Sequence, residues 1–585
     1  MIQRFACLIA FALPLCIAQT YGVRLEDGVD VKMRDGVVLR ADVYHPDKPG
    51  HYPVLLQRTP YDKRNTREFG FRAAAHGYVV VVEDVRGRYS SEGEWYTFRS
   101  ESQDGYDTVE WAAALPDSDG RVGMFGGSYV GATQMLAAIA HPPHLAGICP
   151  VVTASNYHEN WTYQGGAFEQ WFDESWTSGL AQDTMNRRVE RETNATQGMW
   201  KLPLTSYPLY NVPEFAGGAQ ATAELAQYFL DWLAHPNYDE YWKRWSIEEH
   251  FSDIKVPVLT VAAWYDIFQG GSIRNYLGIK AHGGTDAARN GQHLLVVIGG
   301  HAGFGRKIGE VDFGPAATQN EENDVTLRWY DFLFRGVKNE FAGKPVRIFV
   351  MGRNEWRDED EWPLANAHQT RWYLHSDGHA ASLRGDGKLS TNAPASEAAD
   401  RYVYDPSNPV PTIGGPLCCD SEHMPPGPRD QRPAEARDDV LVFSSAPFDR
   451  DTEVTGPVRV ELYAASAAVD TDFTAKLVDV WPNGFAQNLT EGIIRARYRA
   501  SRETPELLNP GQIYRFDIDL WSTSNVFLRG HVLRLEVSSS NFPRFDRNLN
   551  TGTSPAVTGG GYITATQMIY HDAQHPSALV LPMVE

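Results

Sequence analysis

Residues 119–134 read DGRVGMFGGSYVGATQ, and their pattern guides the interpretation of the whole chain. The apolar run 122–125 predicts a short strand, and the small residues after position 130 predict the start of a helix. Ser128 lies between them in a glycine-rich turn. A sharp turn of this kind exposes a serine hydroxyl and directs the following backbone N–H groups toward a developing oxyanion. The stretch therefore predicts a nucleophilic serine.

The turn departs from the G-x-S-x-G pattern at one position. Val130 occupies the fifth place, and Gly131 follows it. Glycines are expected in so tight a turn because side chains would collide there. A Gly-Ser turn at the end of a strand also occurs for structural reasons alone, so the interpretation of Ser128 depends on partners further along the chain.

Both partners are found in the order that an α/β-hydrolase requires, with the acid after a later strand and the histidine in a loop beyond it. Asp266 directly follows the run VPVLTVAAWY, and His301 follows LLVVIGG in a glycine-rich loop. Either residue alone could cap a helix or satisfy a loop. Together they predict a triad in which Asp266 orients His301 and His301 takes the proton of Ser128.

The arrangement of strand-like and helical runs predicts three structural parts. Residues 24–154 and 251–343 alternate strands with helices, and runs such as YVVVVEDV predict strands buried on both faces of a parallel sheet. Residues 155–250 interrupt this rhythm with many aromatics and predict a helical cap inserted into the α/β domain. Residues 344–585 show period-two alternation and frequent turns, which predict a C-terminal β-sandwich of the jelly-roll type.

Composition narrows the function classes and the location. The 585 residues carry a net charge of -21, which excludes nucleic acid as an expected partner. Residues 1–18 combine Arg4, an apolar run and small residues before a cut after Ala18, so we expect a signal peptide and a secreted or periplasmic protein. No later stretch is long and apolar enough to span a bilayer.

The cysteines do not form a disulfide scaffold. Cys149, Cys418 and Cys419 remain after the expected cleavage, and Cys149 lies in an apolar strand that predicts a core position. The adjacent Cys418 and Cys419 allow a disulfide with each other, but two packed thiols is the preferred interpretation. No spaced set of His, Cys and carboxylate residues predicts a metal site, and none is expected.

Several motifs together resemble the cocaine esterase-like family of serine hydrolases. They are RTPYDK at 58–63, DVRGRYSSEG at 84–93, GGSYVGATQ at 126–134, HPNYDEYW at 235–242 and AAWYD at 262–266. The family also includes X-prolyl dipeptidyl peptidases, α-amino acid ester hydrolases and glutaryl-cephalosporin acylases. The resemblance covers nearly the whole chain after the signal peptide. It implies an α/β-hydrolase domain, a helical cap, a jelly-roll domain and no cofactor.

The resemblance also implies an oxyanion hole. In this family the tyrosine of the RTPY loop supplies its hydroxyl beside the backbone N–H of the residue after the serine. The corresponding residues here are Tyr61 and Tyr129. A phenol hydroxyl can stabilise the developing negative charge. Without the resemblance, Tyr61 would be interpreted as a packed loop aromatic.

The family branch is harder to predict. The α-amino acid ester hydrolases carry acidic residues just after the triad Asp, whereas this chain has Ile267, Phe268 and Gln269 there, which argues against selection of a free amine. Acidic residues in the cap leave the peptidase branch open: Glu159, Glu169 and Asp173. Aromatic residues favour an uncharged acyl group and are the candidate pocket residues, although ordinary packing also explains aromatics in a cap: Phe268, Trp161, Phe168 and Trp171.

The expected function is therefore that of a secreted serine hydrolase that cleaves small carboxylic esters or activated amides through an acyl-enzyme. The alternatives within enzymes are an X-prolyl dipeptidyl peptidase, an α-amino acid ester hydrolase and a β-lactam acylase. The alternative outside enzymes is a secreted glycan-binding protein with an inert hydrolase domain. The sequence leaves the oligomeric state open, a homodimer included.

Overall fold

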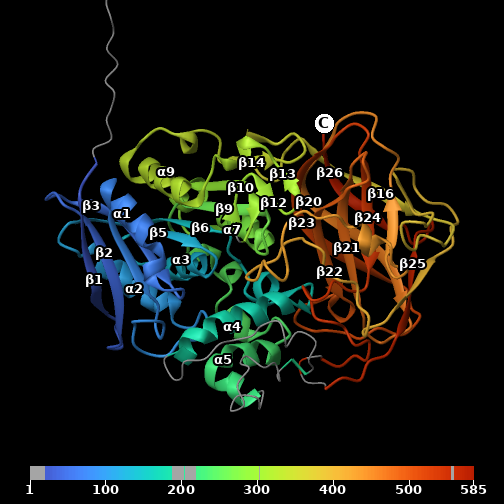
Figure 1. Ribbon diagram of the computed structural model, residues 1–585, viewed down its shortest axis with the longest axis horizontal. Coiled ribbons are helices and arrows are strands. Elements are labelled where there is room, and N and C mark those ends of the chain that lie inside the picture. The colour runs from blue at the N-terminus through green and yellow to red at the C-terminus, as the bar shows by residue number, and fades with distance from the viewer. Residues whose placement is uncertain (1–19, 187–202, 205–218, 302, 555, 557–558) are drawn as a thin grey trace, which may run out of the picture.

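The computed structural model describes residues 20–186, 203–204, 219–301, 303–554, 556 and 559–585 (Figure 1). The predicted signal peptide, residues 1–18, and part of the predicted cap lie outside these ranges. Figure 1 shows an α/β part at the left, a mostly β part at the right, and the helices α4 and α5 below them. No helix within the described ranges is long and apolar enough to cross a membrane.

The first sheet contains a parallel core with antiparallel strands at its edges. Its strand order is β1-β2-β4-β3-β5-β6-β9-β10-β14-β15, and the pairs from β4 to β14 are parallel. The strands up to β10 are β1 (Val23–Lys32), β2 (Val38–Pro46), β3 (Tyr52–Thr59), β4 (Val79–Asp84), β5 (Ser118–Gly127), β6 (Leu145–Val151), β9 (Val258–Tyr265) and β10 (Gln292–Gly300). The predicted α/β fold is confirmed.

Continuous apolar runs in these strands are explained by helices on both faces of the sheet. In β4, Val79 and Val81 join the core that includes α2 (Glu101–Ala113) and α3 (Tyr129–Ile139). Val80 and Val82 join a second core on the other face, with α1 (Arg67–Ala75) and α9 (Glu322–Arg335). Successive side chains of a strand point to opposite faces, so a strand covered on both faces has no polar side.

The first sheet extends beyond the predicted domain boundary near Gly343. β14 (Val346–Val350) pairs in parallel with β10, and β15 (Glu355–Glu359) pairs with β14. Assignment of these two strands to the C-terminal β part was therefore wrong. Four of the five residues of β14 are apolar and fully buried, with Arg347 as the exception, and this nearly continuous apolar run was the signal that could have placed the strand.

The cap connects β6 to β9, as predicted. Its described elements are the π-helical turn η2 (His158–Thr162), β7 (Tyr163–Gln164), β8 (Ala167–Phe168), α4 (Gln170–Asn186), α5 (Ala219–Ala234) and α6 (Glu240–Lys243). α4 and α5 agree with the predicted helical character of the cap. The cap is also attached to the β part, because the backbone N–H of Trp171 donates to the carbonyl of Pro543 at 2.9 Å.

The C-terminal part is mostly β, as predicted. Its strand order is β18-β25-β20-β26-β16-β17-β19-β24-β21-β22, with β23 paired to β20. The strands are β16 (Ala367–His375), β17 (Lys388–Ser390), β18 (Asp400–Tyr404), β19 (Leu441–Ser444), β20 (Thr452–Ser466), β21 (Asp472–Val480), β22 (Ala486–Arg495), β23 (Tyr514–Phe527), β24 (Val532–Ser538), β25 (Ala565–Tyr570) and β26 (Ala578–Val584). The core of this part continues into the α/β part through β14 and α7 (Gln269–His282).

A buried polar cluster joins the ends of three strands in the β part. The ring of His571 contacts Asp400 through Nε2 at 2.9 Å and Glu397 through Nδ1 at 3.1 Å. Glu397 also contacts His375 at 2.7 Å. Burial alone would lower the pKa of His571, but the two carboxylates outweigh it and raise the pKa above its usual value. Acceptors on both ring nitrogens favour the doubly protonated imidazolium.

We expect this cluster to make stability depend on pH. Since the folded-state pKa of His571 is raised, its contribution is complete below about pH 6.5 and is lost as the pH rises through the folded-state pKa. His571→Gln should lower the free energy of unfolding by about 1–3 kcal/mol at about pH 6, and by less at about pH 9. Urea denaturation followed by circular dichroism measures both values. His368→Gln, at an exposed position, serves as the control. An equal loss at the two pH values would contradict this role.

Candidate active site

Ser128 occupies a strained turn between β5 and α3. Its backbone has φ 62° and ψ −130°, a region that residues other than glycine rarely adopt. Two hydrogen bonds hold this conformation: the N–H of Ser128 donates to the carbonyl of Val151 at 3.0 Å, and the hydroxyl of Thr153 donates to the carbonyl of Ser128 at 2.9 Å. Strain of this kind persists only where the surroundings determine it, and it is frequent at functional sites.

The glycines of the turn are explained by close approaches of neighbouring side chains. A Cβ atom at Gly126 would lie 2.5 Å from a methyl group of Val130, and Gly126 has φ 120°. A Cβ atom at Gly131 would lie 2.7 Å from Cβ of Thr153. The departure from G-x-S-x-G is thus accommodated, because Gly126 leaves the space that the side chain of Val130 fills.

The structure brings Ser128, His301 and Asp266 into one hydrogen-bonded chain. Nε2 of His301 lies 2.8 Å from Oγ of Ser128, and Nδ1 of His301 lies 2.6 Å from Oδ1 of Asp266. Asp266 is fully buried, and its second oxygen accepts the backbone N–H of Phe268 at 2.8 Å. The side chain of His301 is 10% exposed and Ser128 is partly exposed, so solvent reaches this hydrogen-bonded series from the serine side.

Tyr61 and the backbone of Tyr129 meet beside this serine. The hydroxyl oxygen of Tyr61 accepts from the indole N–H of Trp176 at 3.0 Å, and the Ser128 side chain and the backbone N–H of Tyr129 lie near enough to act on its pKa. Removal from water raises the pKa of Tyr61, so the hydroxyl keeps its proton at neutral pH. The sequence analysis did not single out Trp176 from the other aromatics of the cap.

The side chain of Tyr129 belongs to a buried hydrogen-bond network that fixes the turn. Its hydroxyl accepts the backbone N–H of Phe98 at 2.7 Å and donates to Glu101 at 3.1 Å. Arg58, which is completely buried, binds Glu101 at 2.9 Å and Glu83 at 2.7 Å. This network links β3, β4, α2 and α3, and it therefore determines where the N–H of Tyr129 lies. No motif in the sequence indicated it.

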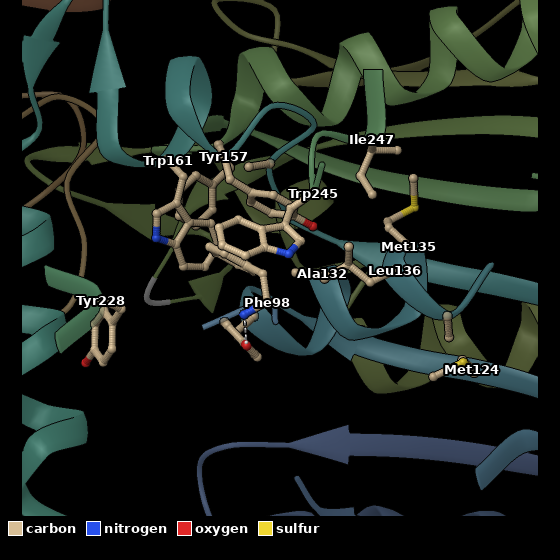
Figure 2. Close-up of a cluster of buried hydrophobic side chains, with 14 of the residues drawn as sticks. Phe98, Met124, Ala132, Met135, Leu136, Tyr157, Trp161, Tyr228, Trp245 and Ile247 are labelled. Carbon is tan, nitrogen blue, oxygen red and sulfur yellow. Dashed lines mark hydrogen bonds between the residues drawn. The ribbon is translucent and has the colours of Figure 1, made fainter. Parts of the chain in front are cut away.

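The candidate pocket aromatics do not all lie together. Phe268 packs edge-on against His301, with ring centroids 5.1 Å apart, and stacks on Trp161 at 4.5 Å. Figure 2 shows Trp161 beside Tyr157 in the buried aromatic cluster over α3. Phe168 lies elsewhere: it packs against Tyr163 and lines a different small cavity, on the side of the β part.

A small pocket opens at His301, and residues of the β part form its other walls. Its volume is about 180 Å³. Its lining is His301, Leu417, Cys418, Cys419, Ser421, Met424 and Pro426. Trp171 of the cap packs in the same hydrophobic cluster as Leu417 and Met424. Cys418 and Cys419 form a disulfide with each other, so the interpretation of two packed thiols was wrong.

The carboxylates that could bind a substrate amine are paired with arginine or fully buried. Glu159 is paired with Arg502 at 3.1 Å, and Glu169 with Arg544 at 3.4 Å. Asp173 is fully buried without a hydrogen-bond partner, and burial raises its pKa well above the usual range. Among the described residues, no group of three or more His, Cys, Asp or Glu is arranged to hold a metal ion.

Comparisons with known proteins agree with this fold. Residues 35–303 match the family described as X-Pro dipeptidyl-peptidase (S15 family), and residues 339–580 match the X-Pro dipeptidyl-peptidase C-terminal non-catalytic domain. A cocaine esterase of Rhodococcus sp. (strain MB1 Bresler) is 38% identical over 577 residues, which cover 95% of this chain and 98% of the relative. The chain belongs to the cocaine esterase-like family of serine hydrolases.

Solved structures of family relatives confirm the architecture. An α-amino acid ester hydrolase superposes with a TM-score of 0.82 at 25% identity, over 100% of both chains. An aminopeptidase from a marine sediment archaeon, Thaumarchaeota archaeon, has a TM-score of 0.82 at 25% identity, over 100% of this chain and 99% of that one. The protein is thus a serine ester hydrolase with an N-terminal α/β domain and a C-terminal mostly β domain.

We expect Gly131 to be essential for the geometry of the turn. In Gly131→Ala, the new methyl group would collide with Thr153, shift the start of α3 and move Ser128. The expected cost is about 1–3 kcal/mol in the free energy of unfolding, together with a loss of hydrolase activity. Gly179→Ala is the matched control, because an added Cβ in α4 meets no atom within 4 Å. Thermal melting and ester hydrolysis measure both effects. Wild-type values for Gly131→Ala would contradict the steric argument.

Proposed function

We propose that this enzyme hydrolyses carboxylic esters with Ser128 as nucleophile, His301 as general base and acid, and Asp266 as the residue that orients His301. The observation that carries the proposal is the continuous hydrogen-bonded chain from Ser128 Oγ through both ring nitrogens of His301 to Asp266, with distances of 2.8 Å and 2.6 Å. A serine hydroxyl is a weak nucleophile unless an adjacent base accepts its proton.

The reaction proceeds in two halves. Oγ of Ser128 attacks the carbonyl carbon while Nε2 of His301 takes the hydroxyl proton, and Asp266 stabilises the resulting imidazolium. The tetrahedral intermediate collapses when the bond to the alcohol oxygen breaks and His301 returns the proton to the leaving alcohol. Water then attacks the acyl-enzyme with His301 again as base, which releases the acid and restores Ser128.

Tyr61 and the backbone N–H of Tyr129 are proposed to stabilise the oxyanion. The phenol is protonated at neutral pH and lies beside both the Ser128 side chain and the backbone N–H of Tyr129. The hydrogen bond that Tyr61 accepts from Trp176 polarises the phenol O–H and strengthens it as a donor. Such preorganised donors act on charge that develops in the transition state, which is why they accelerate the chemical step.

The environment of the site favours an ester with an uncharged acyl group. Phe268 and Trp161 present aromatic surface beside His301, while Glu159 and Glu169 are paired with arginines. The cocaine esterase relative supports an ester as substrate. A peptidase remains the second candidate, supported by the names of the matched family and of the archaeal aminopeptidase. We also propose export, on the basis of residues 1–18.

The proposal is tested first by replacement of the nucleophile. Ser128→Ala should lower the hydrolysis of p-nitrophenyl butyrate by about 10³- to 10⁶-fold, because no other group can form the acyl-enzyme. Ser407→Ala, at an exposed turn of the β part, is the control and should retain wild-type activity. An alanyl-prolyl anilide should not be cleaved by the wild type. Cleavage of the anilide would favour the peptidase instead, and butyrate turnover that survives in Ser128→Ala would refute the nucleophile.

The role of the phenol is tested separately. Tyr61→Phe keeps the ring but removes the hydroxyl, and we expect kcat to fall about 10²- to 10³-fold with little change in KM. The reason is that the lost interaction acts on the transition state more than on the bound ester. Tyr52→Phe is the matched control, since Tyr52 lies at the opposite end of β3 from the active site and its hydroxyl donates to the carbonyl of Lys48. A change in KM alone would assign Tyr61 to substrate binding.

A further inference from the structure

A disulfide between adjacent residues lies in the wall of the candidate active site. Cys418 and Cys419 belong to the long segment between β18 and β19, and they line the same pocket as His301. Cys418 is buried, whereas Cys419 is exposed. The only other described cysteine, Cys149, is buried within β6 and unpaired. A solvent-accessible disulfide and the proposed general base therefore share one cavity.

Cross-linking of the fold does not explain this bond. In the chain-entropy account, a disulfide stabilises a protein more when it closes a longer loop. Adjacent cysteines close the shortest loop that a chain allows, so the bond contributes little by restricting the unfolded state. Its main effect is local: the small ring prevents Cys418 and Cys419 from rotating independently. Cys419 has φ 79°, a left-handed conformation that residues other than glycine rarely adopt.

The rigid ring is next to side chains that shape the pocket. Leu417 precedes it and packs with Trp171 of α4 and with Met424. Trp171 is itself fixed to the β part through the carbonyl of Pro543. The disulfide thus holds part of the wall of a pocket of about 180 Å³ that His301 also lines. In a space of this size, small shifts of a wall change which groups can be bound.

We propose that the Cys418–Cys419 disulfide is a specificity-determining wall of the substrate pocket, and that its reduction weakens the binding of bulky ester substrates. The inference rests on the proposed function of the Ser128 site. Once the bond is broken, Cys419 can relax to an ordinary φ, and the segment that carries Leu417 can move. Binding contacts to a large group then become weaker, whereas a small acyl group depends on them less.

The chemistry requires an external dithiol as the reductant. One thiolate of the dithiol attacks Sγ of Cys419, the exposed sulfur, and the bond to Cys418 breaks. Sγ of Cys418 leaves as a thiolate and takes a proton. The second thiol of the reagent then attacks the mixed disulfide, which releases the Cys419 thiolate and the oxidised cyclic reagent. Two electrons pass from the dithiol to the protein, and an oxidising compartment favours the disulfide.

The test compares two esters under two redox conditions. We would measure kcat and KM of the full chain for p-nitrophenyl acetate and p-nitrophenyl benzoate, before and after treatment with dithiothreitol. Alkylation and mass spectrometry count the thiols. Reduction should lower kcat/KM for the benzoate about five- to twentyfold, chiefly through KM, and should lower it less for the acetate. Without treatment, the variant Cys418→Ser/Cys419→Ser should show the benzoate-to-acetate ratio of kcat/KM that the wild type shows after dithiothreitol. The variant should not respond to dithiothreitol.

The controls separate this role from others. Cys149→Ala keeps the pocket disulfide and should respond to dithiothreitol like the wild type. The proposal would be overturned if the double variant had the same benzoate-to-acetate ratio of kcat/KM as the untreated wild type, whether or not the native disulfide can be reduced. Equal losses on both esters with a lowered melting temperature would also overturn it, because they would indicate a structural cross-link. If the oxidised wild type has no Ser128-dependent activity on either ester, the proposed function fails instead.

Discussion

The backbone of Ser128 is the constraint on which the rest of the site depends. A φ of 62° at a residue other than glycine costs about 1–3 kcal/mol, so neighbouring groups must enforce it. Val151 and Thr153 do so through hydrogen bonds on either side of the residue, and Gly131 allows α3 to approach Thr153 closely. The same turn directs Oγ toward His301 and the next N–H toward Tyr61. One local conformation therefore positions both the nucleophile and an oxyanion donor.

Charged side chains buried beneath the Ser128 turn fix its position. Arg58, Glu83 and Glu101 are almost completely removed from water, which is costly for each ion taken singly. Their mutual hydrogen bonds offset that cost only in one arrangement of β3, β4 and α2. Glu101 also accepts a hydrogen bond from the hydroxyl of Tyr129, so the same network fixes the start of α3. The buried network restricts the geometry at the start of α3 more than it stabilises the fold.

The sequence predicts those features that depend on local patterns. Continuous apolar runs identify the parallel sheet, and the chain order of Ser128, Asp266 and His301 identifies residues that the fold brings together. Tyr61 was assigned only through a family resemblance, since a loop tyrosine has no pattern of its own. The partners of the site that come from the cap and the β part, such as Trp176 and the Cys418–Cys419 disulfide, could not be predicted, because their position depends on packing between distant segments. The apolar run of β14 is visible in the sequence, but it was assigned to the wrong sheet. The sequence of a buried strand does not show which strand it pairs with.

The distribution of roles among the three parts follows from these constraints. The α/β part supplies every proposed catalytic group, whereas Trp176, which donates to the hydroxyl oxygen of Tyr61, belongs to the cap. The turns and buried charges of the α/β part leave little freedom for change. The pocket walls facing His301 come from the segment between β18 and β19, against which Trp171 of the cap packs. Substitutions there can alter substrate choice without disturbing the turn at Ser128. A short covalent ring suits that place, because it stiffens a wall whose residues 418 and 419 lie outside any helix or strand.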